Sequence, residues 1–323
     1  MTKPIVIGYH GHCFDGMASA ALLTRLLRHQ LGDDLQFRYF GLDHQPGGSH
    51  VPEAMLAGEI NAVVDFRYST SDKLTWWFDH HLTGLVGEAE REHFARDRSG
   101  LKFFDPNYGS CTKLIADVAH ARFGLDLSTQ SADLIHWAHL IDTAGFPDAQ
   151  TAVALREPAL HLMTVIEVHG DDGFIVPRIE RLSAGESLDT IARDPKVESL
   201  FKPLHARHEQ ACELIKQRAA LSGGVVHFDL ADVGDDRYNK FIPYWLYPDA
   251  RYCVAVTAGP KRAKVSVGSN PWAPVPRTHD ISAICARYGG GGHAVVGAVS
   301  LGANEVDKAR SIASDIAAEL SID

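Results

Sequence analysis

The residues that could do chemistry are His and Asp side chains in four short segments, and each segment follows an apolar run. They are His10, His12 and Asp15; Asp65; Asp79, His80 and His81; and Asp142. A single Asp at the end of a strand is more often a helix cap or a turn residue. Several carboxylates brought together, however, repel one another and resist burial, and bound divalent cations reverse that penalty. Taken jointly, the four segments predict a divalent metal centre.

The elements before these segments are predicted to bring them together. Apolar strands are expected at Ile5 to Gly8, Leu35 to Phe40, Ile60 to Val64 and Leu74 to Phe78, and helices at Gly16 to Leu27, Ser110 to Phe123 and Gln130 to Ile141. This alternation indicates an α/β domain with a doubly wound parallel sheet. Ligands of such sheets bind beyond the carboxyl ends of the strands, where three of the four segments lie.

The run Asp79-His80-His81 follows the aromatic strand that contains Trp76 and Trp77. Because side chains alternate along a strand, the two imidazoles are expected to face opposite sides. One of them could then bind metal while the other faces substrate, and Asp79 could orient an imidazole.

The second half of the chain predicts helices and then a smaller α/β domain. From Thr151 to about Ala220 the pattern is mostly helical, and four prolines are expected to break it: Pro158, Pro177, Pro195 and Pro203. Strands follow at Val225 to Leu230, Tyr252 to Thr257 and Ala263 to Val267, and a helix at Glu305 to Leu320. We expect a metal-binding domain at 1–200, a helical connector at 201–222 and a substrate-binding domain at 223–323.

Composition limits the partners. A net charge of -10 over 323 residues disfavours long duplex nucleic acid, which depends on many Lys and Arg contacts to phosphate, although the stretch 237–287 is basic enough to receive an anion. The apolar run at the N-terminus is too short for a signal peptide or a membrane span, so we expect a cytoplasmic protein without a membrane partner. The five cysteines are odd in number and scattered, which indicates neither a disulfide framework nor a zinc knuckle. A homodimer is compatible with the sequence.

The sequence resembles the DHH phosphoesterase family over nearly its whole length. The family is named for the run found here as Asp79-His80-His81, and the segment from His10 to Asp15-Gly16, followed by small residues, is similar to its first motif. Asp65 and Asp142 are similar to its second and fourth motifs. The run Gly289 to His293, followed by Gly297-Ala298, is similar to the glycine-rich signature of the C-terminal domain that accompanies DHH domains.

The resemblance implies two divalent metal ions and assigns their ligands. His10 and Asp15 would bind different ions, and Asp65 would bridge them. His80 and Asp142 would complete the shell of the second ion. Mixed imidazole and carboxylate ligation suits manganese, with magnesium, cobalt or zinc as alternatives.

Two further assignments concern the same segments. The resemblance implies that His81 contacts the scissile phosphate. Cys13 stands where many members of the family have Asp, so one ion would gain a thiolate, recruit His12 instead or keep an extra water. A buried, inert thiol is the alternative reading of Cys13.

In the C-terminal domain, the resemblance implies substrate contacts in the glycine-rich run and after the strand that ends near Ser269. The expected residues are Gly290, Gly291, Gly292, His293, Ser269 and Asn270. Consecutive glycines allow close backbone approach and can present N–H groups to phosphate oxygens. A tight turn without a ligand is the alternative, and substrate is expected to bind in a cleft between the two domains.

The resemblance implies a manganese-dependent phosphodiesterase or exonuclease acting on short substrates, such as oligonucleotides, dinucleotides or 3′-phosphoadenosine phosphate. An inorganic polyphosphate or pyrophosphate hydrolase is the enzymatic alternative. A nucleotide-binding sensor without catalysis is the alternative of another class, and an intact set of metal ligands argues against it.

Overall fold

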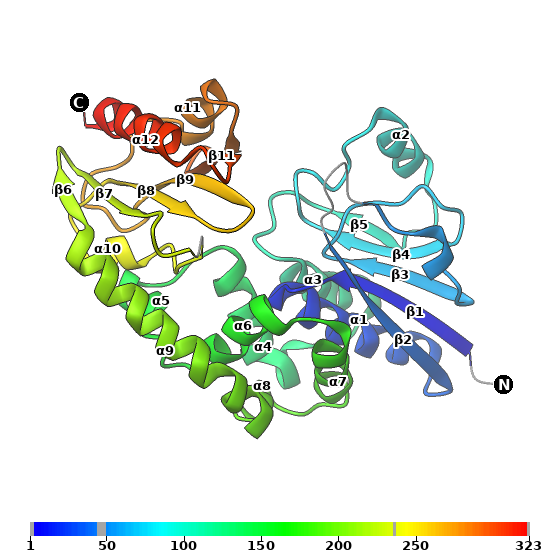
Figure 1. Ribbon diagram of the computed structural model, residues 1–323. Coiled ribbons are helices and arrows are strands. Elements are labelled where there is room, and N and C mark those ends of the chain that lie inside the picture. The colour runs from blue at the N-terminus through cyan, green and yellow to red at the C-terminus, as the bar shows by residue number, and fades with distance from the viewer. Residues whose placement is uncertain (1–2, 44–49, 235–236, 322–323) are drawn as a thin grey trace. The chain divides into compact units, whose positions relative to one another are not determined.

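The chain forms two compact units in the computed structural model, which describes residues 3–43, 50–234 and 237–321 (Figure 1). The first unit contains the residues up to Phe146 together with Arg156–Lys202. The second contains Pro147–Leu155 and the residues from Pro203 onward. The compact units therefore divide the long helix α9, Pro195–Arg218, near its first third. The functional boundaries at 200 and 222 stay a prediction.

The first unit is built on a five-stranded sheet with the order β2-β1-β3-β4-β5, in which every pair is parallel. The strands are β1 Lys3–His10, β2 Leu35–Leu42, β3 Ile60–Val64, β4 Leu74–Asp79 and β5 Lys102–Phe104. Four of them match the expected strands closely. The apolar runs of β1, β3 and β4 are buried on both faces, as inner strands of a parallel sheet require, whereas β2 lies at the edge and only its last residue, Leu42, is fully buried. The predicted fold class is confirmed.

Helices cover both faces of this sheet. On one face α1, Phe14–Leu31, packs against β1 to β3, α3, Cys111–Phe123, packs against β4, and α7, Asp172–Ser183, packs against β2. On the other face Phe94 of α2, Glu88–Arg96, packs against a core that includes Val63 and Trp77. The sheet is therefore doubly wound, the architecture in which ligands bind beyond the carboxyl ends of the strands.

The remaining helices of this unit are α4 Ser128–Asp142, α6 Pro158–His169 and α8 Leu188–Ala192. The expectation that all four prolines break helices is wrong for two of them. Pro158 and Pro195 are the first residues of their helices, where the missing N–H costs nothing. Pro177 and Pro203 lie inside α7 and α9, which continue through them.

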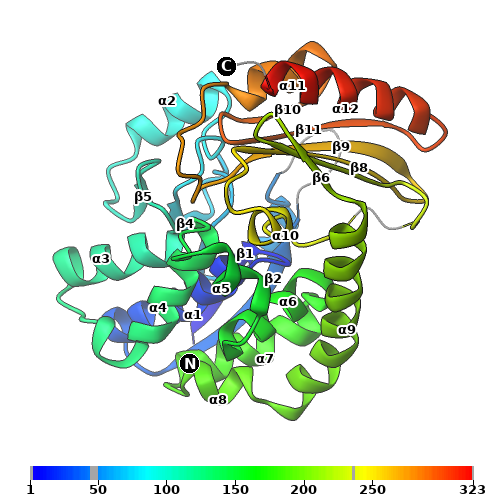
Figure 2. The same cartoon turned by 90° about the vertical axis from the view of Figure 1, so that its left-hand side faces the viewer.

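The second unit holds a six-stranded mixed sheet with the order β10-β11-β9-β8-β7-β6. Its strands are β6 Ala220–Ser222, β7 Val225–Leu230, β8 Tyr252–Ala258, β9 Arg262–Ser269, β10 Gly291–His293 and β11 Val296–Gly302. The helices α11, Ile281–Arg287, and α12, Val306–Leu320, lie on one side of the sheet (Figure 2) and share its apolar core. The short helices α5, Ala149–Ala154, and α10, Ile242–Leu246, contact each other in this unit.

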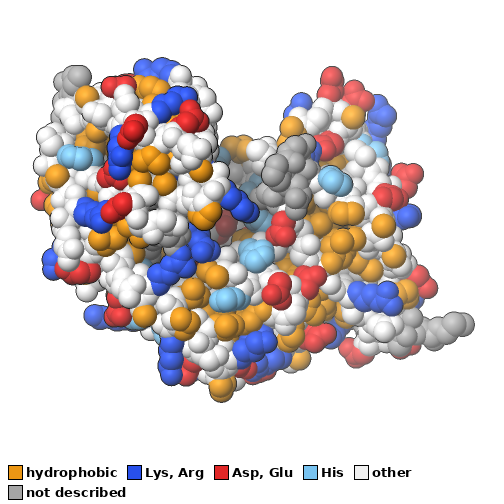
Figure 3. Space-filling model, in the orientation of Figure 1, with side chains coloured by type: hydrophobic (Ala, Val, Ile, Leu, Met, Phe, Trp, Pro, Cys, Tyr) orange, Lys and Arg blue, Asp and Glu red, His pale blue; other side chains and the backbone are white. Residues whose placement is uncertain are grey.

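The surface carries both charge signs. Figure 3 shows Lys and Arg side chains interspersed with Asp and Glu over the visible face. None of the helices within 3–43, 50–234 and 237–321 is long and apolar enough to cross a membrane.

Candidate metal centre

The loops at the carboxyl edge of the first sheet bring together the residues singled out in the sequence. Two sets of three side chains have ligand atoms within 4.8 Å of one another. The first set is His10, Asp65 and His81, and the second is Asp15, His80 and Asp142. They come from the ends of β1, β3 and β4, the first turn of α1 and the last residue of α4. His10, Asp65, His80 and His81 meet at one edge because the parallel strands all end there, and the helices α1 and α4 add Asp15 and Asp142.

Asp65 belongs to the first set and also faces His80 of the second. Its Oδ2 is 3.3 Å from Nδ1 of His10, and its Oδ1 is 3.5 Å from Nε2 of His80. The Nε2 atom of His80 is also 3.3 Å from Oδ2 of Asp142 and 3.9 Å from Oδ2 of Asp15. The two oxygens of Asp65 therefore point toward different ligand groups, as a bridging carboxylate must.

The backbone of Asp65 is in the left-handed region, with φ of 56°. Residues other than glycine adopt this conformation at a cost of roughly 1–2 kcal/mol, although Asp tolerates it better than most. The N–H of Asp65 donates to the carbonyl of Phe78 at 2.9 Å, so the neighbouring strand β4 fixes this turn. Such strain is concentrated at functional sites, and here it turns the carboxylate toward the ligand sets.

The donor set fits divalent cations. Ligand atoms that share one ion at about 2.0–2.2 Å lie about 3 to 3.5 Å from one another, close to the spacings around Asp65 and His80. Both residues are nearly buried, and neither Oδ1 of Asp65 nor Nε2 of His80 has a hydrogen-bond partner among the described residues. Buried polar atoms normally have partners, so a cation between these groups would account for both.

Two neighbouring interactions hold the second ligand set in place. The carboxylate of Asp15 accepts hydrogen bonds from the N–H groups of Cys111 at 2.7 Å and Thr112 at 3.1 Å, in the first turn of α3. The carbonyl of Tyr108 accepts from Nδ1 of His80 at 3.0 Å, which leaves Nε2 to face the carboxylates. Sequence reasoning missed these partners because backbone groups carry no signal in the residue types.

Asp79 is fully buried and orients His81. Its Oδ1 accepts from Nδ1 of His81 at 2.7 Å and from the N–H groups of His80 and His81 at 2.9 and 3.2 Å. This is the orienting contact that was expected from the sequence. The expectation that the two imidazoles face opposite sides is wrong, because β4 ends at Asp79 and the alternation stops there. The two rings lie side by side, with centroids 4.4 Å apart, and both approach Asp65.

The close packing of four carboxylates with imidazoles changes their proton affinities. Burial, together with the charge of Asp65, raises the pKa of Asp142 to about 6 and that of Asp15 well above its usual range. Burial opposes a charge on His80, yet the neighbouring carboxylates, Asp65 first, raise the pKa of this imidazole to about 9. Burial also opposes a charge on Asp65, but His10 and His80 outweigh it and lower the pKa of that carboxyl. Without cations, bound protons therefore neutralise part of the carboxylate charge that divalent ions would otherwise neutralise.

The two uncertain ligands lie at the edge of the centre. The Sγ atom of Cys13 is 3.5 Å from Oδ2 of Asp65, and burial followed by the charges of Asp65 and Asp15 raises the pKa of this thiol well above its usual value. His12 is exposed and has a positive φ of 51°. Neither belongs to the two ligand sets, and the roles of both stay predictions.

The glycine-rich run and Ser269 lie in the second unit, and part of their polar groups already have partners. The N–H of Gly290 donates to the carbonyl of Cys285 at 2.9 Å, and Gly291, Gly292 and His293 form the exposed strand β10. The hydroxyl of Ser269 donates to the carbonyl of Val295 at 3.0 Å.

Asn270 is buried and braces its own loop. Its amide donates to the carbonyls of Pro248 and Ala250 at 3.0 and 2.8 Å, and its Oδ1 accepts from the N–H of Trp272 at 3.0 Å. These bonds give Asn270 a structural reason to be present. The substrate contacts expected in this unit stay predictions.

No family model and no curated protein matches this sequence. Solved structures do match it. A pGpG-specific phosphodiesterase, PggH from Vibrio cholerae, superposes with a TM-score of 0.67 at 19% identity, over 98% of this chain and 99% of that one. The DHH domain of a protein described as a member of a ribosomal-protein family superposes with a TM-score of 0.59 at 13% identity, over 98% of this chain and 87% of that one. The chain has the DHH fold.

RecJ from Thermus thermophilus, in complex with Mn²⁺, superposes with a TM-score of 0.50 at 15% identity. The match covers 98% of this chain but 52% of RecJ, so this chain spans about half of that protein. These likenesses confirm the resemblance to DHH proteins at the level of the fold. At such identities the chemistry has to be argued from the side chains.

Proposed function

We propose that this protein is a phosphoesterase with two divalent metal ions that hydrolyses short phosphodiesters. The observation that carries the proposal is the position of Asp65, whose two carboxylate oxygens face His10 on one side and His80 on the other. A bridging carboxylate between two ligand sets suits a pair of cations, and a site that only bound a ligand would not require it.

Different residues of the protein would bind the two ions and contact the substrate. The first set, His10, Asp65 and His81, and the second set, Asp15, His80 and Asp142, would hold the ions; bound there, the ions would activate water and neutralise phosphate oxygens. Because Asp79 accepts from Nδ1 of His81, the Nε2 atom of His81 remains to bind an ion or to contact the phosphate. The sequence favoured the phosphate, whereas the short distances around Asp65 support a role of His81 as a metal ligand as well.

Manganese and a short nucleotide substrate are part of the proposal. Among proteins of the same fold, PggH is described as specific for pGpG, and RecJ structures contain Mn²⁺ or Mg²⁺. The net charge of -10 also favours a short substrate over a long polyanion. Cleavage of polyphosphate or pyrophosphate remains the competing outcome.

The test is a substrate panel with a metal titration. Purified protein with Mn²⁺ should turn over at least one of pGpG, 3′-phosphoadenosine phosphate and a chromogenic phosphodiester, and chelation should abolish that turnover. Asp142→Asn should weaken Mn²⁺ binding, whereas Asp133→Asn, an exposed carboxylate on the same helix, should leave it unchanged. Binding of nucleotide without turnover would indicate a sensor and refute the proposal.

The role of His81 can be separated from metal binding. His81→Ala should lower turnover and keep both ions if its imidazole contacts only the phosphate. Loss of one equivalent of Mn²⁺, measured by elemental analysis of the dialysed variant, would place His81 among the ligands instead.

A further inference from the structure

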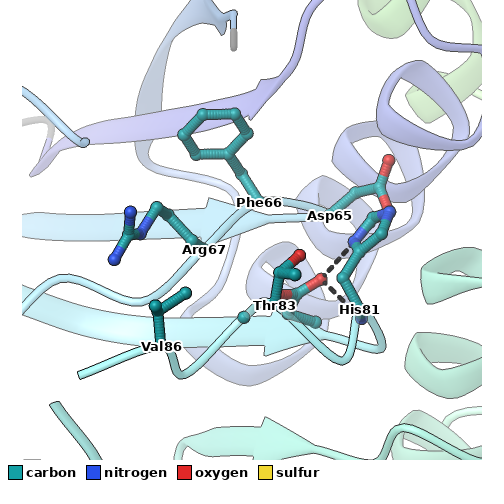
Figure 4. Close-up of a pocket in the computed structure, with 8 residues that line it drawn as sticks. Asp65, Phe66, Arg67, His81, Thr83 and Val86 are labelled. Atoms are coloured by element: carbon teal, nitrogen blue, oxygen red, sulfur yellow. Dashed lines mark hydrogen bonds and ion pairs between the residues drawn. The ribbon is translucent and has the colours of Figure 1, made fainter. Parts of the chain in front are cut away.

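A pocket lies directly beside the first ligand set, between the loop that follows β3 and the turn that follows β4 (Figure 4). Its volume is about 90 Å³. Asp65 and His81 line one end, Arg67 and Val86 the other, and Thr83 lies between them. The pocket therefore extends from the ligand sets, where a phosphate would react, to the guanidinium of Arg67, which belongs to neither set.

Backbone hydrogen bonds hold the two walls of this pocket together. The N–H of Tyr68, in the loop after β3, donates to the carbonyl of Gly84 in the turn after β4 at 2.9 Å. The N–H of Gly84 in turn donates to the carbonyl of His81 at 2.8 Å, which closes the turn. A cavity with walls fixed in this way is preorganised, so little ordering is needed when a ligand enters.

Arg67 is held in place but most of its hydrogen-bonding capacity is unused. Its side chain is 22% exposed, and its Nη2 donates to Oε1 of Glu90 at 2.7 Å. Glu90 is itself fixed, because its Oε2 accepts from the N–H groups of Val86 at 2.9 Å and Gly87 at 3.1 Å at the start of α2. A guanidinium has five N–H donors, and the described part of the chain supplies an acceptor for one of them.

We propose that this pocket is a subsite for a second phosphate group of the substrate, bound by the guanidinium of Arg67. The inference rests on the proposed phosphodiesterase function and names a specificity-determining residue for it: Arg67 would recognise the terminal phosphate monoester of a dinucleotide such as pGpG. The planar guanidinium of Arg can donate two parallel hydrogen bonds to the oxygens of one phosphate. A partly buried guanidinium binds such oxygens more strongly than an exposed one. The hydroxyl of Thr83 adds a donor on the path between the two phosphates.

The experiment compares one dinucleotide with and without its 5′-phosphate. Binding is measured by calorimetry with Ca²⁺ in place of Mn²⁺, and kcat/KM with Mn²⁺. The wild type should prefer the phosphorylated dinucleotide by about tenfold or more, the scale of a hydrogen bond to a charged group. Arg67→Gln should lose this preference and keep its affinity and turnover for the unphosphorylated dinucleotide.

A matched control separates the subsite from a structural brace. Arg96→Gln removes an exposed guanidinium from α2 that pairs with Glu92 at 2.8 Å, and it should leave the preference intact. Equal losses for both dinucleotides in Arg67→Gln, with a lowered unfolding temperature, would mean that Arg67 only ties its loop to α2, and would overturn the subsite.

The subsite and the proposed function fail in different ways. A wild type that hydrolyses both dinucleotides equally well, and binds them equally, overturns the subsite while the function stands. A wild type that hydrolyses neither but binds the phosphorylated one better through Arg67 overturns the function and supports the subsite. A wild type that binds neither overturns both.

Discussion

Gly84 offers a test of how His81 is positioned, because it packs directly against the carboxylate that orients this imidazole. A Cβ at position 84 would come closer to Oδ2 of Asp79 than real Cβ atoms approach any atom, and it would also press on the carbonyl of His81 and on Phe104. Gly84→Ala must therefore displace the carboxylate or the turn. Asp79 is fully buried, and displacement of its carboxylate would strain the three hydrogen bonds that its Oδ1 accepts from His80 and His81.

The size of the effect follows from these contacts. Relief of the clash requires a displacement of about 1 Å, and overpacking of this kind costs about 1–3 kcal/mol of stability. The bond from Nδ1 of His81 to Asp79 is 2.7 Å long and has little tolerance for that movement. Loss of such an orienting partner lowers activity or metal affinity about 10- to 100-fold, so we expect turnover to fall by that factor.

The assay is Mn²⁺-dependent hydrolysis of a chromogenic phosphodiester, combined with urea unfolding. Gly87→Ala is the matched control in the same loop, because its φ is -84° and the nearest atom to its Cβ would be 3.9 Å away, on Glu90. It should cost no more than about 1 kcal/mol, as the N-cap of α2, and keep full turnover. Wild-type turnover in Gly84→Ala would refute the argument that Asp79 must stay in place to orient His81.

Three other predictions address the metal centre. Asp65→Ala should abolish activity and Mn²⁺ occupancy together, since the carboxylate faces both ligand sets; elemental analysis with both ions retained would rule out a bridge. Cys13→Asp should preserve or raise turnover with Mn²⁺ if Cys13 occupies a ligand position, and a loss of turnover would favour an inert thiol. The metal-free protein should lose stability as the pH rises from 6.5 to about 9, because the raised pKa of His80 stabilises the fold only while this imidazole is protonated. The raised pKa of Asp142 acts in the same direction between pH 3.8 and about 6. Thermal unfolding in chelator should show this slope, and saturating Mn²⁺ should flatten it; a slope of opposite sign would contradict the charge assignment.

The sequence alone was enough for four of the five strands of the first sheet and for the ligand candidates, whereas the short edge strand β5 was missed. The strands at Ile60–Val64 and Val225–Leu230 match the expected strands residue for residue. The first is an almost fully buried apolar run, and the second alternates buried apolar residues with the outward-facing His227 and Asp229. Asp65 and Asp79 were recognised by the same logic, since polar residues directly after such runs lie at the carboxyl edge of a parallel sheet. Local pattern thus determines both the element and the edge to which its last side chains belong.

Only the tertiary structure decided how these side chains are turned. That His80 and His81 lie side by side depends on the end of β4 at Asp79, and the orientation of Asp65 depends on a left-handed backbone that β4 holds through Phe78. The hydrogen-bond partners of Asp15 are backbone N–H groups of α3, and the residue types in the sequence do not reveal such partners. The identity of a residue specifies what its side chain can bind. The direction in which the side chain points comes from contacts between segments that are distant in the chain. The pocket at Arg67 likewise exists only because two such segments meet.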